Sequence, residues 1–362
     1  ITLASKSEEK NMKVVVAIDS FKGSATSAEL NQAVKNGILA AFPKINVETF
    51  EIADGGEGSM SALQSGLGGN LINVKTVDLM QHPMRASYLL IDERLAVIEA
   101  AEVVGINKIK PNEKTIQEAT TFGLGALFLD AKKRGATEII LSLGGSGTSD
   151  GGLGLLEALE AEDFSEIKIT GLADVTNVYA GAEGYAKVFG KQKGGTAEIL
   201  EQQDRAAQAF VQKIKKERKI DLQKIPGTGA AGGLGGALIL LGGTLEPGFN
   251  KIAELLKIEE AIKTADLIIT GEGQMDFQTA KGKVPFGMAK LGAKYHVPTI
   301  AFCGSLSENL GEMNQVLLAS YSIQRKVLPL AKAMEKEVTL KNIEVLTKNV
   351  LKTWCSGQND CQ

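Results

Sequence analysis

Hydrophobic and polar positions follow one order repeatedly along this chain: a short apolar run, a polar glycine-rich loop, and a stretch with helical spacing. The apolar runs lie at 12–18, 46–52, 138–143 and 266–270. The loops that follow them read DSFKGS, ADGGEGS, GGSGTSDGG and TGEGQMDFQTAKGK. Continuous apolar strands that alternate with helices are typical of a parallel sheet covered on both faces. Because ligands bind at the carboxyl ends of the strands in such sheets, we expect the site to lie among these loops.

The same rhythm predicts an α/β protein of two domains. Residues 12–70 and 255–356 share the strand–loop–helix order, and we expect them to form one discontinuous, doubly wound Rossmann-like domain with a parallel sheet. Residues 71–254 begin with closely spaced strand-like runs at 71–79, 86–91 and 95–99, which indicates an inserted mixed α/β domain. We expect the active site in the cleft between the two domains.

Length, composition and charge narrow the class of protein. A chain of 362 residues is long enough for about two domains, and 44% hydrophobic with 23% charged residues is typical of a globular protein. A net charge of −3 gives no basic footprint for nucleic acid or an acidic membrane. No long apolar run or signal-peptide centre is visible, so the cytoplasm is the expected compartment. We expect small-molecule partners, no nucleic acid, no membrane, and a monomer or homodimer.

The loop GGSGTSDGG (144–152) is predicted to bind phosphate, although the chain contains no Walker A sequence. Successive backbone amides in a glycine-rich turn form an anion-binding nest, and this loop adds the hydroxyls of Ser146, Thr148 and Ser149. We therefore expect phosphate contacts from Gly144, Gly145, Ser146 and Thr148. A tight turn in which Asp150 caps the following helix is compatible with this role.

A further glycine cluster, PGTGAAGGLGGALILLGG (226–243), satisfies the pattern GxGxxG. A nicotinamide site is disfavoured because no strand precedes the cluster and no suitable acidic residue follows about 20 positions later. We interpret the cluster as a helix N-terminus whose amides face an anion. This interpretation adds four phosphate-binding candidates: Thr228, Gly229, Gly232 and Gly233. The alternative is that the glycines allow close helix packing.

Seven short motifs occur in one order along the chain. They are DSFKGS (19–24), ADGGEG (53–58), LGGSGTSDGG (143–152), DVTN (174–177), VFGKQKG (188–194), GTGAAGG (227–233) and TGEGQMDFQTAKGKVP (270–285). This order resembles that of class I glycerate kinases, and the resemblance runs from about Met12 to Trp354. The chain departs from the family at Ile18, where proline is usual, and in GSGTSDGG, where GSATNDGG is more common. The second change keeps the loop small and polar.

The resemblance implies a two-domain α/β enzyme that transfers the γ-phosphate of ATP to a hydroxyl of D-glycerate with Mg²⁺. It favours 2-phosphoglycerate over 3-phosphoglycerate as the product. One alternative is that the protein uses its anion-binding loops without transferring phosphate, as a non-catalytic binder or sensor of small phosphorylated acids. A NAD-dependent oxidoreductase is a third class, which rests on the GxGxxG pattern alone.

Phosphoryl transfer to a hydroxyl requires positive groups around the phosphates, a carboxylate for the metal, and a proton acceptor. The two histidines lie outside the glycine-rich loops, so we expect a loop carboxylate to accept the proton. The candidates are Asp19, Asp54, Glu57, Asp150, Asp174, Glu272 and Asp276. We favour Asp174, in DVTN, as proton acceptor or metal anchor, with a purely structural Asx turn as the alternative.

The first two loops carry the candidates for binding the acid. Lys22, with Ser20 beside it, is predicted to bind substrate and to take part in catalysis as a point charge, unless it is a solvated loop lysine. Asp54 and Glu57 are predicted to contact glycerate or Mg²⁺, with capping of the next helix as the alternative. Arg85 is a candidate for the substrate carboxylate.

The last loop, TGEGQMDFQTAKGK, concentrates donors and acceptors directly after an apolar strand. We expect Glu272 and Asp276 either to hold metal together with Asp174 or to pair with Lys281 and Lys283. Lys283 is also expected to contact the nucleotide phosphates. A purely structural hairpin is disfavoured because it needs fewer polar groups.

Overall fold

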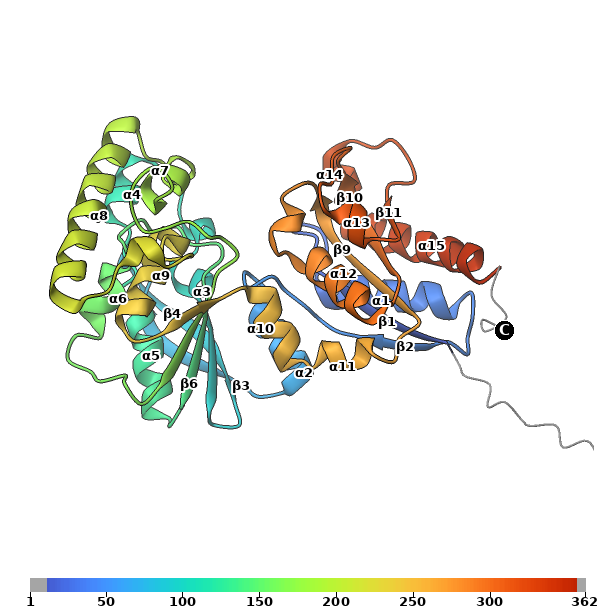
Figure 1. Cartoon of the computed structure of the whole chain (residues 1–362), viewed down its shortest axis with the longest axis horizontal. Coiled ribbons are helices and arrows are strands. Elements are labelled where there is room, and N and C mark those ends of the chain that lie inside the picture. The colour runs from blue at the N-terminus through green and yellow to red at the C-terminus, as the bar shows by residue number, and fades with distance from the viewer. Residues whose placement is uncertain (1–11, 357–362) are drawn as a thin grey trace, which may run out of the picture. The chain divides into compact units, whose positions relative to one another are not determined.

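Figure 1 shows the computed structural model of the chain, which describes residues 12–356. The chain forms two compact units. Within the described residues, unit 1 combines 12–53 with 253–356, and unit 2 comprises Asp54–Ile252. Each unit has its own sheet, one of five strands and one of six. The protein is therefore an α/β protein with two sheets.

The five-stranded sheet of unit 1 is entirely parallel, with the strand order β11–β10–β9–β1–β2. Its strands are β1 (Lys13–Ile18), β2 (Asn46–Thr49), β9 (Leu267–Met275), β10 (Thr299–Leu306) and β11 (Ala319–Ser322). Numbered within the sheet, this is the doubly wound order 2-1-3-4-5. Since β1 pairs directly with β9, the two ends of the chain share one sheet.

Helices cover both faces of this sheet because successive strand residues point to opposite sides. On one face, the cluster of Val14, Val16 and Ile269 packs against α1 and α15. On the other face, α12 contacts β9, β10 and β1. The helices of unit 1 are α1 (Ser27–Leu39), α11 (Ile258–Ile262), α12 (Val284–Tyr295), α13 (Met313–Val316), α14 (Leu330–Ala333) and α15 (Lys336–Cys355).

The six-stranded sheet of unit 2 is mixed, with the order β3–β4–β5–β6–β7–β8. The strands β5 to β8 are parallel, whereas β3 and β4 form an antiparallel edge. The strands are β3 (Asn70–Val77), β4 (Pro83–Ile91), β5 (Leu95–Glu99), β6 (Glu138–Ser142), β7 (Lys168–Leu172) and β8 (Thr244–Glu246). Because β5 to β8 run in the same direction, the four loops that follow them lie at the same end of the sheet, where the strands have their carboxyl ends.

The helices of unit 2 surround this sheet and its core, which includes Tyr88, Phe128 and Leu141. They are α2 (Ser59–Leu67), α3 (Ala100–Val104), α4 (Glu113–Glu118), α5 (Leu124–Lys133), α6 (Leu153–Ala158), α7 (Tyr185–Phe189), α8 (Ala197–Arg218) and α9 (Ala230–Leu240). The chain then passes back to unit 1 within α10 (Gly248–Leu255). No helix within residues 12–356 is both long and apolar enough to cross a bilayer.

Two elements differ from the sequence-based expectation. Helix α2 contacts β4 and β5 and lies in unit 2, so the chain leaves unit 1 soon after β2 and not near residue 70. Within α9, residues 231–233 have left-handed φ/ψ angles, and regular helix begins only at Leu234. The apolar run at 46–52 gives no sign that the chain enters unit 2 soon after β2. The glycines of 226–243 give no sign that regular helix begins only at Leu234.

Candidate functional site

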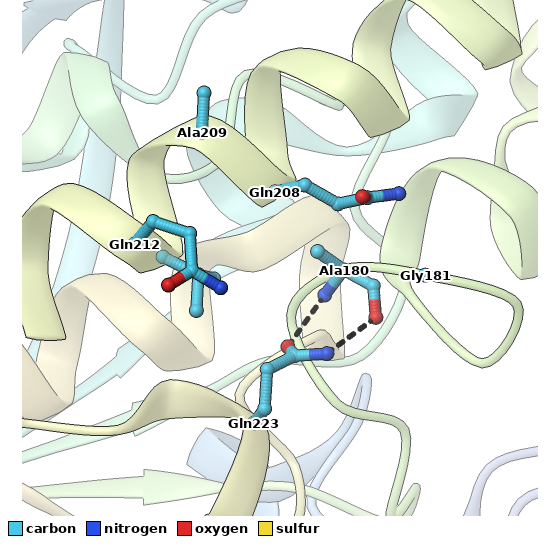
Figure 2. A pocket seen from close by; sticks show the side chains of 7 residues that line it. Ala180, Gly181, Gln208, Ala209, Gln212 and Gln223 are labelled. Carbon is cyan, nitrogen blue, oxygen red and sulfur yellow. Dashed lines mark hydrogen bonds between the residues drawn. The ribbon is translucent and has the colours of Figure 1, made fainter.

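A cavity of about 390 Å³ lies in unit 2 beside α8 (Figure 2), but it is unsuited to an anionic ligand. Its polar lining consists of the neutral side chains of Gln208, Gln212 and Gln223. Gln223 is already fixed, because its Oε1 accepts from Ala180 N at 2.9 Å and its Nε2 donates to Ala180 O at 2.7 Å. None of the charged residues predicted from the sequence lines this cavity. Doubly wound α/β sheets bind their ligands instead at the carboxyl ends of the strands.

In unit 1, the loops after β1 and β9 meet at the point where the strand order reverses. Backbone N of Asp19 donates to Gly271 O at 2.9 Å, which joins the DSFKGS loop to the end of β9. Asp19 is 7% exposed and Glu272 is 5% exposed, so two carboxylates are buried at this edge. Doubly wound sheets bind ligands at such a switch point.

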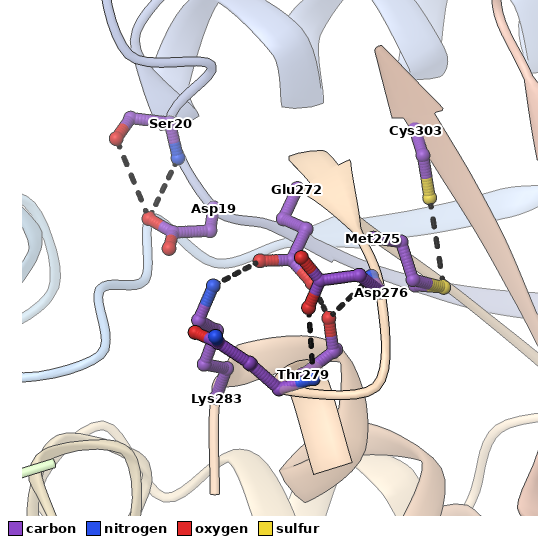
Figure 3. Close-up of polar contacts among 9 residues, drawn as sticks. Asp19, Ser20, Glu272, Met275, Asp276, Thr279, Lys283 and Cys303 are labelled. Carbon is purple, nitrogen blue, oxygen red and sulfur yellow. Dashed lines mark hydrogen bonds and ion pairs between the residues drawn. The ribbon is translucent and has the colours of Figure 1, made fainter. Parts of the chain in front are cut away.

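Glu272 organises the TGEGQMDFQTAKGK loop (Figure 3). The Thr279 hydroxyl donates to Glu272 Oε1, and Lys283 Nζ lies 3.2 Å from Glu272 Oε2. Backbone N of Asp276 donates to Thr279 Oγ1 at 3.2 Å, which closes the turn. Both oxygens of Glu272 are therefore engaged, and the carboxylate holds the Lys283 ammonium at the N-terminus of α12. The pairing of Glu272 with Lys283 is one of the two arrangements expected from the sequence.

The DSFKGS loop presents Lys22 to solvent. Ser20 N donates to Asp19 Oδ1 at 2.7 Å, and a bridge between Phe21 and Ala25 closes the short turn that follows. Lys22 is exposed at this turn and forms no ion pair with any residue in 12–356. Its ammonium is available to an anionic ligand.

Other reactive side chains are not suited to catalysis. Cys303 lies beside Met275, and burial, aided by the charge of Glu272, raises the pKa of its thiol to about 12. The thiol is therefore neutral near neutral pH. His82 is exposed and lies 3.2 Å from Asp78 Oδ2, and His296 ends α12 in a left-handed conformation.

In unit 2, the ADGGEG loop packs against the carboxyl end of β6. The Ser142 hydroxyl donates to the carbonyls of Gly55 and Gly56, and Gly56 N donates to Asp54 Oδ1 at 3.1 Å. A Cβ added to Gly144 would lie 2.6 Å from Gly56 Cα. Asp54 and the start of the GGSGTSDGG loop therefore lie side by side.

The GGSGTSDGG loop is anchored from inside the unit. Gly147 N donates to Val104 O at 2.7 Å, and Ile106 N donates to Gly145 O at 2.9 Å. Thr148 is fully buried and Ser146 is 7% exposed, whereas Gly145 is exposed. Of the four residues predicted here to bind phosphate, Gly144 and Gly145 are open to solvent, whereas Ser146 and Thr148 are buried.

Asp150 has the capping role named as the compatible alternative. Its carboxylate accepts from Thr121 N at 2.7 Å, from Gly152 N at 3.0 Å and from Gly154 N at 3.2 Å. The bonds from Gly152 and Gly154 satisfy amides at the start of α6, and the bond from Thr121 ties this turn to the segment before α5. Ser149 is likewise turned inward, since its hydroxyl donates to Gln203 Oε1 at 2.9 Å.

The GTGAAGG segment lies behind this loop. Gly151 N donates to Gly232 O at 2.9 Å, and a Cβ at Gly232 would lie 2.0 Å from Thr148 O. Thr228 is fully buried and donates to Leu222 O at 2.8 Å, while Gly229 N donates to Asn177 O at 2.9 Å. Gly233 is also buried. This geometry fits close backbone packing, the alternative named for these glycines.

Asp174 follows β7 at the same edge. It is half-buried, and solvent does not reach its Oδ1. The loop is held by Ala173 N, which donates to Glu246 O at 2.9 Å, and by Asn177 Nδ2, which donates to Glu183 O at 3.1 Å. Arg85 is exposed on β4, opposite Lys75 of the edge strand β3.

Two buried charged residues of unit 2, Glu99 and Lys193, are not among the candidates predicted from the sequence. Glu99 ends β5 and accepts from Met60 N at 2.8 Å, and burial raises its pKa to about 7. The carboxylates of Glu102 and Glu57 raise it further. Lys193 lies in the VFGKQKG motif and is 3% exposed. Nothing in IEAAEVV or VFGKQKG distinguishes these groups from ordinary surface charges.

Comparisons with known proteins agree along most of the chain. The sequence pattern of the "Glycerate kinase family" matches residues 14–167 and 160–355. The chain is 36% identical to "Glycerate kinase" of Bacillus cereus, covering 95% of this chain and 98% of that protein. It is 34% identical to "Glycerate 2-kinase" of Escherichia coli, covering 84% and 88%. A crystal structure from Salmonella typhimurium LT2, assigned as a glycerate kinase 2, matches with a TM-score of 0.84 and 32% identity over 96% of this chain and 100% of that chain.

Proposed function

Because this chain belongs to the glycerate kinase family and is an ATP-dependent phosphotransferase, we propose that it phosphorylates D-glycerate at the 2-hydroxyl. The family match over residues 14–355 carries the proposal, and the relative named glycerate 2-kinase supports the choice of hydroxyl. The loop chemistry at the strand ends of each unit agrees with an anionic substrate and a nucleotide. We also predict that the protein is cytoplasmic, that it is a monomer or homodimer, and that its active site lies in a cleft between the domains.

The nucleotide phosphates are proposed to bind Gly144, Gly145 and Ser146 through backbone amides, together with the Lys283 ammonium. Gly144 is partly exposed and Gly145 is exposed, and Lys283 is held in place by Glu272. A nest of amides and a positioned ammonium both stabilise phosphate oxygens. The buried members of the predicted set then support this loop from behind: Thr148, Thr228, Gly229, Gly232 and Gly233.

The acid is proposed to bind through Ser20, Lys22, Asp54, Glu57 and Arg85. Lys22 and Arg85 are exposed cations, which suit the carboxylate of glycerate. Asp54 and Glu57 are carboxylates on the loop beside Gly144, and they suit the hydroxyl groups of the acid.

Asp174 is proposed to accept the proton of the reacting hydroxyl. In the transfer, a bond forms between the substrate oxygen and the γ-phosphorus, and the bond from that phosphorus to the ADP oxygen breaks. The hydroxyl proton then passes to the Asp174 carboxylate. Asp174 is half-buried, and its loop is tied to β8 through Ala173 and to Glu183 through Asn177, which supports this role. Lys22 contributes a positive charge to the same reaction.

Mg²⁺ is proposed as the cofactor, with Asp174, Glu272 and Asp276 as the candidate carboxylates. Magnesium prefers oxygen ligands and usually takes one or two carboxylates, with phosphate and water oxygens completing the shell. Asp276 lies half-exposed at a loop tip, with Oδ1 accepting from Gln278 N at 2.8 Å. Glu272 fits less well, because Thr279 and Lys283 engage both of its oxygens and the ammonium repels a cation. Bound Mg²⁺ would neutralise charge on the phosphates.

The product of the wild-type reaction tests the proposed regiochemistry. After incubation with MgATP and D-glycerate, the proton-coupled ³¹P NMR spectrum should show a new doublet, because the 2-phosphate is attached to a carbon that carries one hydrogen. A triplet would identify the 3-phosphate, whose carbon carries two hydrogens, and would overturn the choice of hydroxyl.

A further inference from the structure

Lys193 places a buried positive charge directly behind the GGSGTSDGG loop. It ends the short 3₁₀ turn Lys191–Lys193 that precedes α8, and its side chain points inward. Its Nζ donates to Thr148 O at 2.5 Å and lies 3.4 Å from Ser146 Oγ. Both acceptors belong to the loop proposed to bind the nucleotide phosphates, so the lysine contacts the loop and not a neighbouring side-chain network.

The charge of Lys193 has no ion-pair partner within residues 12–356. Asp150 favours the ammonium from a greater distance, but amides of Thr121, Gly152 and Gly154 already bind that carboxylate. Burial lowers the pKa of Lys193 to about 8. A buried ammonium without a paired anion is costly, and an anion brought close to it is correspondingly favoured.

Ser146 lies between Lys193 and the exposed part of the loop. When the ammonium donates to Ser146 Oγ, the serine proton can be donated either to Thr148 Oγ1, 3.4 Å away, or to a ligand oxygen. The contact with Thr148 O fixes the backbone on the inner side. Lys193 can therefore act on a bound anion through Ser146 and through the orientation of the loop, without touching the anion itself.

We propose that Lys193 is a positioning residue whose ammonium orients Ser146 and the Thr148 carbonyl, so that the loop takes the nucleotide phosphates as the counter-ion of the buried charge. The inference rests on the proposed function and deepens it, because it assigns this loop to the phosphates of ATP and not to the acid. It also gives the VFGKQKG motif a physical role.

The first test compares Lys193→Met with Lys191→Met, an exposed lysine of the same motif. Lys193→Met should weaken ATP binding about 10–100-fold, the range for losing a hydrogen bond to a charged group. Adenosine binding, followed by ligand-observed NMR, should be unchanged, because adenosine carries no phosphate. Lys191→Met should leave both affinities unchanged. An unaltered ATP affinity in Lys193→Met, or an equal loss for ATP and adenosine, contradicts the proposal.

The second test uses the wild-type protein, so it stands even if Lys193→Met does not fold. Near pH 8 the free lysine is partly deprotonated, and ATP binding should restore its charge. Calorimetry in two buffers of different ionisation enthalpy should then report proton uptake on ATP binding. The uptake should diminish at more acidic and more basic pH. The charged group that acts on Lys193 in the free protein is Asp150.

No proton uptake near pH 8 overturns the inference. Uptake that persists in a folded Lys193→Met variant overturns it as well, because another group would then be responsible. Neither test uses glycerate turnover. If ATP binding behaves as described but D-glycerate is not phosphorylated, the proposed function fails while the role of Lys193 stands.

Discussion

Asp174→Asn should lower the turnover number by about 10²–10⁴-fold, the usual contribution of a general base, while thermal unfolding stays unchanged. Asparagine keeps the size of aspartate and its ability to form a local turn, so a structural role would survive the change. It removes the negative charge that accepts a proton or anchors Mg²⁺. Since Asp174 is only half-buried and follows β7 in a braced loop, the variant should fold normally.

Asp163→Asn is a matched control for this effect. Asp163 also precedes a turn in unit 2, with its Oδ1 accepting from Ser165 N at 2.9 Å, but it is exposed and lies before β7. It should retain full activity. If Asp174→Asn keeps more than about a tenth of the wild-type turnover number, the proton acceptor is another carboxylate, with Asp54 or Asp276 next in order.

Gly232→Ala should destabilise unit 2 by about 2–5 kcal/mol, which combines left-handed backbone strain with overpacking. Gly232 has φ of +70°, and the new Cβ would lie 2.0 Å from the backbone carbonyl oxygen of Thr148. A carbonyl in a loop anchored on both sides has little room to move. The circular dichroism melting midpoint should fall by about 4–20 °C, at roughly 2–4 °C per kcal/mol for a unit of this size.

Gly242→Ala is the control variant that separates backbone strain from overpacking. Gly242 has φ of +85°, but no atom lies within 4 Å of its added Cβ, so only the backbone strain of about 1–2 kcal/mol applies. The single tryptophan is not a suitable probe, because Trp354 lies in unit 1. If Gly232→Ala melts no lower than Gly242→Ala, the close contact between the GTGAAGG segment and the GGSGTSDGG loop is not tight in solution.

The sequence predicts the sheets well where strands are apolar and end in polar loops. The run 12–18 becomes β1, and 266–270 becomes the first half of β9, which pairs with it. The chain order of strands also indicates that the two chain ends belong together. The sequence of helix α2 (59–67) does not indicate which of the two sheets the helix packs against, because its apolar face would suit either unit.

The candidate site is harder to predict, because burial decides what each polar group does. In GTGAAGG, the glycines suit a helix N-terminus as well as close packing, and the contacts of Gly229 with Asn177 and of Gly232 with Thr148 favour packing. Lys193 differs from exposed Lys191 by burial alone, which depends on how the 3₁₀ turn meets the distant GGSGTSDGG loop. Contacts between residues so far apart in the chain leave no local pattern.

The claim that this chain is a glycerate kinase is tested most directly by ADP release from MgATP with D-glycerate as the acceptor. L-lactate is the control acid: it keeps a carboxylate, carries its 2-hydroxyl in the opposite configuration to D-glycerate, and lacks the 3-hydroxyl. We expect D-glycerate to support ADP release well above the rates with L-lactate or with no acid. ADP release with D-glycerate that does not exceed either control would contradict the account.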